Sequence, residues 1–223
     1  MTRFPALAFL VALSSVAALG EIKENRSPAA PITVYTQFEE PCSGVAFEQM
    51  KAELVSIMSP IGLEFEWRSL DAARGNDVAV ELAVVSFKGS CNMDEPPRPA
   101  SEPGALGWTY TSEGHILPFS DVQCDRIRRF IGPLVADTDL VRREFLLGRA
   151  MGRVLAHELY HVFANTRHHG SAGVAKPFYS APDLVTDRFR FEQKETRALR
   201  HQAFPALVRS SRDRAPAAAS TGQ

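Results

Sequence analysis

The sequence predicts an α+β fold, in which a small mixed sheet is followed by one long helix and then by shorter C-terminal helices. Two observations support this prediction. Strand-like runs gather ahead of Pro133, whereas beyond it the apolar residues recur at helical spacing. The chain has 223 residues, of which 45% are hydrophobic, and this is enough for one sizeable core. We therefore expect a single folded domain over residues 21–205.

Both ends of the chain differ in composition from this domain. Residues 1–20 combine a positive charge at Arg3, an apolar run, and small side chains at Ala18 and Gly20, which is typical of a secretory signal peptide. The alternative is a membrane anchor, but the run is short for a bilayer span. We expect cleavage after Gly20 and a secreted or periplasmic mature protein. Residues 206–223 are polar and rich in proline and alanine, and we expect them to be disordered.

The charge balance argues against two classes of partner. The chain has 25 basic and 26 acidic residues, and its formal net charge is −1. A net charge this small gives no field strong enough to suggest a nucleic-acid or membrane-surface partner. Beyond the predicted signal, no run of about 18 consecutive apolar residues occurs, so we expect no membrane contact once the signal is removed.

The chain has three cysteines, Cys42, Cys91 and Cys124. They are too few and too widely spaced for a cysteine-based zinc site, and in an exported protein a disulfide is the better interpretation. Cys91 and Cys124 bracket a loop-rich segment, where a cross-link reduces the entropy of the unfolded chain. We predict a disulfide between these two cysteines.

The first half of the domain has a β-α-β-β order. Residues 32–38 (ITVYTQF) are apolar and β-branched, which predicts a strand. Apolar residues between Cys42 and Gly62 recur at helical spacing, and Pro60 with Gly62 ends that helix. Residues 63–70 and 78–87 then alternate as strands do.

A proline- and glycine-rich excursion covers residues 94–107, and two strands follow it. We place the strands over residues 105–111 (ALGWTYT) and 114–119 (GHILPF), with a turn at residues 112–114. Next, we predict a short helix over residues 120–132 (SDVQCDRIRRFIG).

A long helix follows an acidic N-cap cluster at residues 137–139. The helix is supported by an apolar stripe at Leu140, Leu147, Met151, Val154, Leu155, Leu159 and Val162. The sequence HELYH, residues 157–161, falls on its last two turns. After a glycine-containing loop over residues 168–180, residues 181–204 predict one or two closing helices.

The HELYH sequence carries the chemistry. His157 and His161 are four residues apart, so on a helix they share one face and can reach the same ion. Glu158 lies beside that face, where it can contact a metal-bound water without being a ligand. This HExxH arrangement supplies two imidazoles for zinc and a general base. The alternative is a surface helix with two solvated histidines.

A catalytic zinc ion requires three protein ligands and an open fourth position. The third ligand could be His168 or His169, in the turn after the helix, or Glu192 or Glu195, on a later helix. The turn is favoured because it returns a side chain to the metal with little loop entropy to lose. Asn165 is the expected helix end, because asparagine tolerates the left-handed conformation.

With these residues the chain resembles the zincin metallopeptidases, in particular the metzincins, whose motif is HExxHxxGxxH followed by a loop with a buried methionine. Ala164 and Arg167 stand where that pattern has glycine and the third histidine. The sequence is more similar to a group of small secreted bacterial zincin-like proteins, in which the helix ends one residue later. That resemblance implies a helix end at Asn165 and a third ligand at His169, with His168 as the alternative.

The resemblance also implies a zincin-like (metzincin-like) fold beyond the motif. It places a turn at residues 173–176, with Ala175 where the methionine is expected, and a closing helix at Asp183 and Leu184. In such folds an edge strand binds the substrate backbone by strand addition. Residues 108–119 are the candidate region for that strand.

The function implied is that of a secreted zinc-dependent peptidase acting on a peptide or protein substrate. Zn²⁺ is the expected cofactor, Glu158 is the expected general base, and Tyr179 is a candidate to stabilise the oxyanion. One alternative is a non-catalytic, zinc-stabilised binding protein that keeps a zincin-like shell. Another is a gluzincin-like peptidase with Glu192 or Glu195 as the third ligand.

Overall fold

The computed structural model describes residues 31–75, 77–94 and 104–203, so the predicted signal peptide (1–20) and the predicted tail (206–223) lie outside the described residues. The described chain has the predicted α+β class, with a five-stranded mixed sheet and several helices. None of its described helices is both long and apolar enough to cross a membrane.

The sheet has the strand order β2-β1-β3-β5-β4. Its strands are β1 (Ile32–Phe38), β2 (Phe65–Ser69), β3 (Leu82–Lys88), β4 (Gly107–Ser112) and β5 (His115–Gln123). The pairs β1–β2, β1–β3 and β3–β5 are parallel, whereas β4 runs antiparallel to β5. Since β4 comes last in this order, it is an edge strand of the described sheet, and the predicted tight turn joins it to β5.

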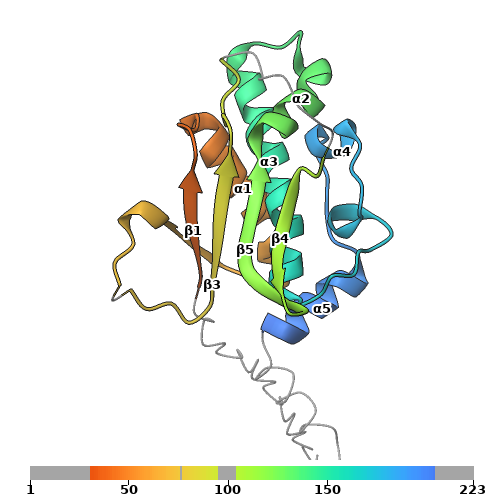
Figure 1. The fold of residues 1–223 in the computed structure, drawn as a ribbon. Coiled ribbons are helices and arrows are strands. Elements are labelled where there is room, and N and C mark those ends of the chain that lie inside the picture. Colours follow the sequence, from red (N-terminus) through yellow and green to blue (C-terminus); the bar gives the residue numbers. More distant parts are fainter. Residues whose placement is uncertain (1–30, 76, 95–103, 204–223) are drawn as a thin grey trace, which may run out of the picture.

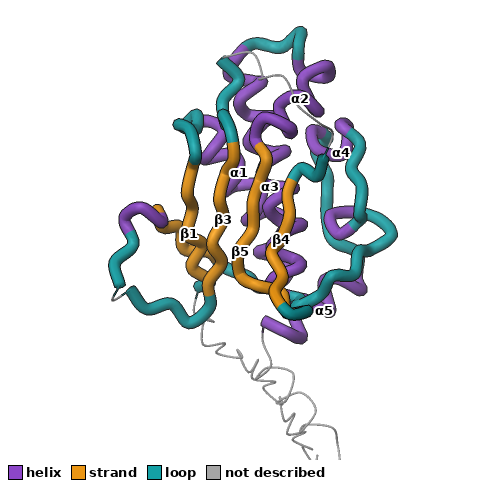
Figure 2. The backbone as a smooth tube through the Cα atoms, viewed as in Figure 1, coloured by secondary structure: helices purple, strands orange, loops and turns teal. Residues whose placement is uncertain are grey.

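Helices cover one face of this sheet, and α3 and α1 lie behind it in Figure 1. The helices are α1 (Gly44–Met58), α2 (Cys124–Val135), α3 (Leu140–Phe163), α4 (Ala181–Val185) and α5 (Gln193–Ala203). The loops that follow α3 run along the β4 side of the molecule (Figure 2). The end of α3, these loops and the β4 edge thus meet in one place.

Two glycines let α1 and α3 pack closely. A Cβ atom at Gly148 would clash with the carbonyl oxygen of Ala46, and one at Gly152 would lie 2.8 Å from the carbonyl oxygen of Met50. Since the glycines are four residues apart, they share the α3 face that meets α1. The close approach fixes α3, and with it the HELYH segment, on the hydrophobic core.

The structure corrects two predicted boundaries. β3 begins at Leu82 rather than at Val78, because β1, its partner, begins only at Ile32, and Val78 is 84% exposed. Residues 120–123 extend β5 instead of starting the next helix, because they pair with β3 on one side and, in part, with β4 on the other. α2 therefore starts at Cys124 and ends three residues later than predicted.

Two covalent or ionic links hold the layers together. Cys91 and Cys124, the predicted pair, form a disulfide between the chain after β3 and the first residue of α2. Arg153 on α3 is fully buried, and its Nε lies 2.8 Å from Glu53 Oε1 on α1. Arg153 also donates to the carbonyl oxygen of Asp183 in α4. Arg153 thereby links α4 to both α1 and α3.

Candidate metal centre and active site

The end of α3 presents the HELYH side chains to one site. Asp139 caps the start of the helix, as its residue type predicts, by accepting a hydrogen bond from the backbone N–H of Arg142. The helix ends at Phe163, and Asn165 adopts the left-handed conformation with φ of 44°. That reversal turns the chain back across the last turns of α3, as expected from an asparagine at this position.

The reversal brings a third histidine to the first two. Ligand atoms of His157, His161 and His169 all lie within 4.8 Å of one another, close enough to hold a metal ion. The Nε2 atoms of His157 and His161 are 3.1 Å apart. Among the described residues, no other group of three or more potential ligands lies this close together.

The other candidates for third ligand lie elsewhere. His168 is exposed, as is His169, but His168 does not belong to the cluster, and its backbone N–H donates to the hydroxyl of Thr166. Glu192 accepts a hydrogen bond from the Ser171 hydroxyl, and Glu195 is buried against Gly170. The geometry therefore favours His169 over His168 and over the two glutamates.

Backbone carbonyls orient two of the three rings. The Nδ1 atom of His157 lies 2.8 Å from the carbonyl oxygen of Val174, and that of His161 lies 2.7 Å from the carbonyl oxygen of Thr166. An Nδ1–H that donates to a carbonyl leaves Nε2 as the lone-pair nitrogen, which is how ligating histidines are usually held. No side-chain pattern in the sequence could have shown these partners, because both are main-chain atoms.

Desolvation, which is strong for the buried His157 and His161 and partial for the more exposed His169, favours the neutral form of the three rings. It lowers the pKa of His157 from 6.5 to about 4, and it lowers the pKa values of His161 and His169 as well. The charge of the neighbouring histidines adds to the effect in each case. A neutral imidazole is the form that binds a metal, so the three rings are ready for a cation at neutral pH.

The donor set fits zinc. Three neutral imidazoles that leave room for a water ligand are a typical catalytic zinc set. With Zn–N bonds of ~2.0–2.1 Å, tetrahedral geometry separates two ligand nitrogens by about 3.3 Å. The observed 3.1 Å between the two Nε2 atoms on α3 is close to that separation.

Glu158 lies beside the three histidines and is only 4% exposed. Its Oε2 atom accepts a hydrogen bond of 2.8 Å from the Thr109 hydroxyl on β4. Burial raises the pKa of Glu158 to about 7, and the hydrogen bond from Thr109 opposes that rise. A carboxylate with a pKa near neutrality is suited to accept and then release a proton at neutral pH.

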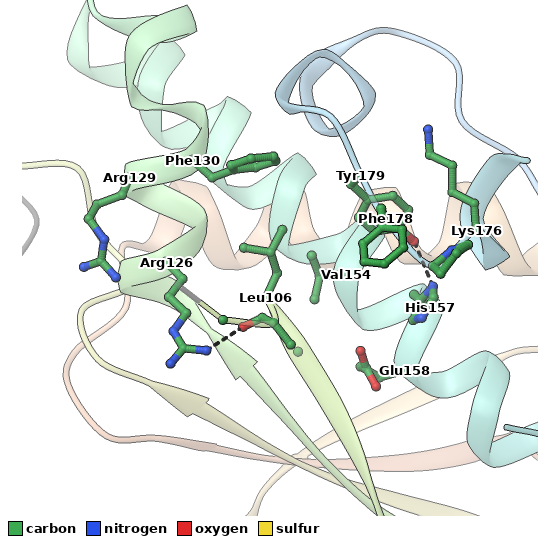
Figure 3. Close-up of a pocket in the computed structure, with 14 residues that line it drawn as sticks. Leu106, Arg126, Arg129, Phe130, Val154, His157, Glu158, Lys176, Phe178 and Tyr179 are labelled. Atoms are coloured by element: carbon green, nitrogen blue, oxygen red, sulfur yellow. Dashed lines mark hydrogen bonds between the residues drawn. The ribbon is translucent and has the colours of Figure 1, made fainter. Parts of the chain in front are cut away.

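Tyr179, the candidate for stabilising the oxyanion, lies against the His157 ring. Its hydroxyl donates to the carbonyl oxygen of Val174 and lies 3.1 Å from His157 Nδ1 (Figure 3). Burial raises the pKa of Tyr179 well above its ordinary value, so the hydroxyl remains a donor. These contacts make Tyr179 a support for the His157 ring, and its oxyanion role stays a prediction.

Two cavities open on the site along the β4 edge. One of about 500 Å³ has an apolar wall that includes Leu106, Phe130 and Val154 (Figure 3). The other, of about 360 Å³, extends past His161 and His169. His157 and Glu158 line both cavities, and so does Gly107 of β4. A ligand that occupied both cavities would therefore cross Glu158 and run beside the edge strand.

The loop after the site follows the arrangement that the resemblance implies. A 3-10 turn covers Gly173–Ala175, with Ala175 buried, and α4 contains Asp183 and Leu184. No family model matches the chain, and no curated protein is significantly similar to it.

Proposed function

We propose that this protein is a secreted zinc-dependent peptidase with a zincin-like, more narrowly metzincin-like, fold. One observation carries the proposal: a buried carboxylate, Glu158, stands next to three converging histidines and lines both cavities that meet there. A purely structural zinc site has no need of a general base. A helical HExxH segment that is followed by a turn and a third histidine supports the same assignment.

Peptide hydrolysis assigns a role to each group. His157, His161 and His169 would hold zinc, which when bound supplies a Lewis acid that acidifies water and polarises a carbonyl oxygen. Glu158 accepts a proton from the attacking water as the water oxygen bonds to the scissile carbonyl carbon. It then gives that proton to the leaving nitrogen as the C–N bond breaks, which restores the carboxylate.

The β4 edge supports a peptide as the substrate. Within the part of the chain that the structure describes, β4 pairs only with β5, so its outer edge can accept another strand. An extended peptide that pairs there would use main-chain hydrogen bonds for affinity and the adjoining cavities for side-chain selection. The strand falls within the predicted region, residues 108–119, apart from its first residue.

Export belongs to the proposal for two reasons. The N-terminal twenty residues have the composition of a signal peptide. The Cys91–Cys124 disulfide also suits an oxidising compartment, where such bonds persist.

The variant Glu158→Gln tests the proposal. We expect one zinc ion per chain to be retained, because Glu158 is not a ligand, while the hydrolysis of unfolded casein falls by about 10²- to 10⁴-fold, the usual contribution of a general acid–base group. Glu48→Gln is the matched control, since the exposed Glu48 lies on α1 and pairs with Lys51. Full activity in Glu158→Gln would refute the general-base role. A wild type that binds zinc and cleaves no peptide would indicate the zinc-stabilised binding protein instead.

A further inference from the structure

The inner face of β4 is shaped around Glu158. Successive residues of a strand point to opposite faces, so Gly107 and Thr109 share one face of β4. That face meets α3, whereas Trp108 and Tyr110 on the other face are 37% and 43% exposed. Gly107 and Thr109 therefore face α3, and both lie against Glu158.

Thr109 provides the specific contact. Its Oγ1 atom lies 2.8 Å from Glu158 Oε2, 3.1 Å from the Glu158 carbonyl oxygen and 3.1 Å from Ser120 Oγ. A threonine hydroxyl has one hydrogen to donate and can accept two. The shortest contact goes to the carboxylate, and a hydrogen bond to a charged acceptor is the strongest of the three. Ser120 on β5, which is 2% exposed, is then the donor to Thr109.

Gly107 provides the space. A Cβ atom at this position would lie 2.9 Å from Glu158 Oε1, 2.8 Å from Val154 Cγ1 and 3.0 Å from the carbonyl oxygen of Asp121. Because one of these neighbours is backbone and the other two belong to α3, a larger residue would displace the carboxylate or separate the strand from the helix. The absent side chain at Gly107 and the hydroxyl of Thr109 thus define one position for the Glu158 carboxylate.

We propose that Thr109 is a positioning residue for the general base, and that Ser120 orients the Thr109 hydroxyl. The inference rests on the proposed peptidase function. Thr109 holds Oε2 of Glu158, which leaves Oε1 to take the proton from water. β4 then has two roles: its outer edge pairs with the substrate backbone, and its inner face fixes the Glu158 carboxylate. One strand therefore aligns the general base with the substrate.

Two substitutions at Thr109 test this role. Thr109→Val keeps the shape of the side chain and removes the hydroxyl, and we expect kcat to fall about 10- to 100-fold, as for the loss of one hydrogen bond to a charged group. KM should change less than kcat does, because the Thr109 hydroxyl is bonded to Glu158, although Thr109 also lines the smaller cavity. Thr109→Ser restores the hydroxyl and should recover most of the activity. Ser120→Ala, which leaves Thr109 in place, should lower kcat about two- to fivefold.

Thr36→Val is the matched control. Thr36 is buried on β1 and its hydroxyl also donates to an oxygen, the carbonyl of Arg68, but it lies three strands away from β4. This variant should retain the wild-type kcat. In a Glu158→Gln background, Thr109→Val should cause no further loss, because both changes act through the same carboxylate. A wild-type kcat in Thr109→Val, or a full further loss in the double variant, would overturn the inference.

A crystal structure of Thr109→Val tests the same point without turnover. We expect the Glu158 carboxylate to leave its position beside β4 while the three histidines stay in place. If the wild type hydrolyses no peptide, the proposed function fails, and the position of Glu158 in this variant still decides the inference. An unmoved carboxylate would overturn it.

Discussion

Opening the Cys91–Cys124 disulfide should lower the thermal stability of the protein substantially. The two cysteines are 33 residues apart in sequence, and the segment between them contains both β4 and β5. In the chain-entropy model, releasing a loop of this length stabilises the unfolded chain by about 3.7 kcal/mol. For a chain of this size, each kcal/mol shifts Tm by about 2–4 °C, so we expect a fall of about 7–15 °C.

Thermal melts followed by circular dichroism measure the effect. The double variant Cys91→Ala/Cys124→Ala should melt lower than the wild type, and the wild type under reducing conditions should do the same. Reduction separates the loss of the cross-link from the loss of two buried sulfur atoms. Cys42→Ala, which removes the free thiol, is the control. A Tm unchanged both by reduction and by the double substitution would refute the reasoning.

Two further predictions concern the metal ligands and the free thiol. His169→Ala should weaken zinc binding by more than about 100-fold, because removing a ligand costs more affinity than removing a residue that only hydrogen-bonds to a ligand. His168→Ala should leave the zinc affinity unchanged. Competition with a chelator measures both affinities. Burial, with a contribution from the charge of Glu144, raises the pKa of Cys42 from 9.0 to about 12. At pH 8 the thiolate fraction of Cys42 should be about 1000-fold below that of an ordinary cysteine. Iodoacetamide should therefore label Cys42 in the folded protein about 1000-fold more slowly than in the unfolded chain. Equal labelling rates in the two states would contradict this prediction.

The central helix and its end could be predicted because their signals are local. Periodic apolar residues, an aspartate N-cap and the asparagine after the last turn each act within a few residues of their own position. The structure has α3 capped by Asp139, and it places Asn165 at positive φ. The convergence of His157 and His161 follows directly from helical geometry.

The remainder of the site depends on contacts between distant segments. Nothing near Thr109 in the sequence indicates that it meets Glu158, since the contact requires β4 to occupy the edge of the sheet beside α3. The same limit explains the misplaced start of α2: the sequence CDRIRRF is helical by pattern, but Ser120 joins β5 through its pairing with β3 and β4. Strand pairing is set by the whole sheet, so local patterns do not determine it.

The two backbone carbonyls that hold the histidine rings impose an unusual requirement on the segment after α3. Because Thr166 and Val174 act through main-chain oxygens, the segment is constrained in its length and path more than in its side chains. Most substitutions between these two positions, apart from those at Gly170 and Gly173, should leave both rings oriented. Deleting a single residue there other than His169 should misalign His157 even though every ligand remains present.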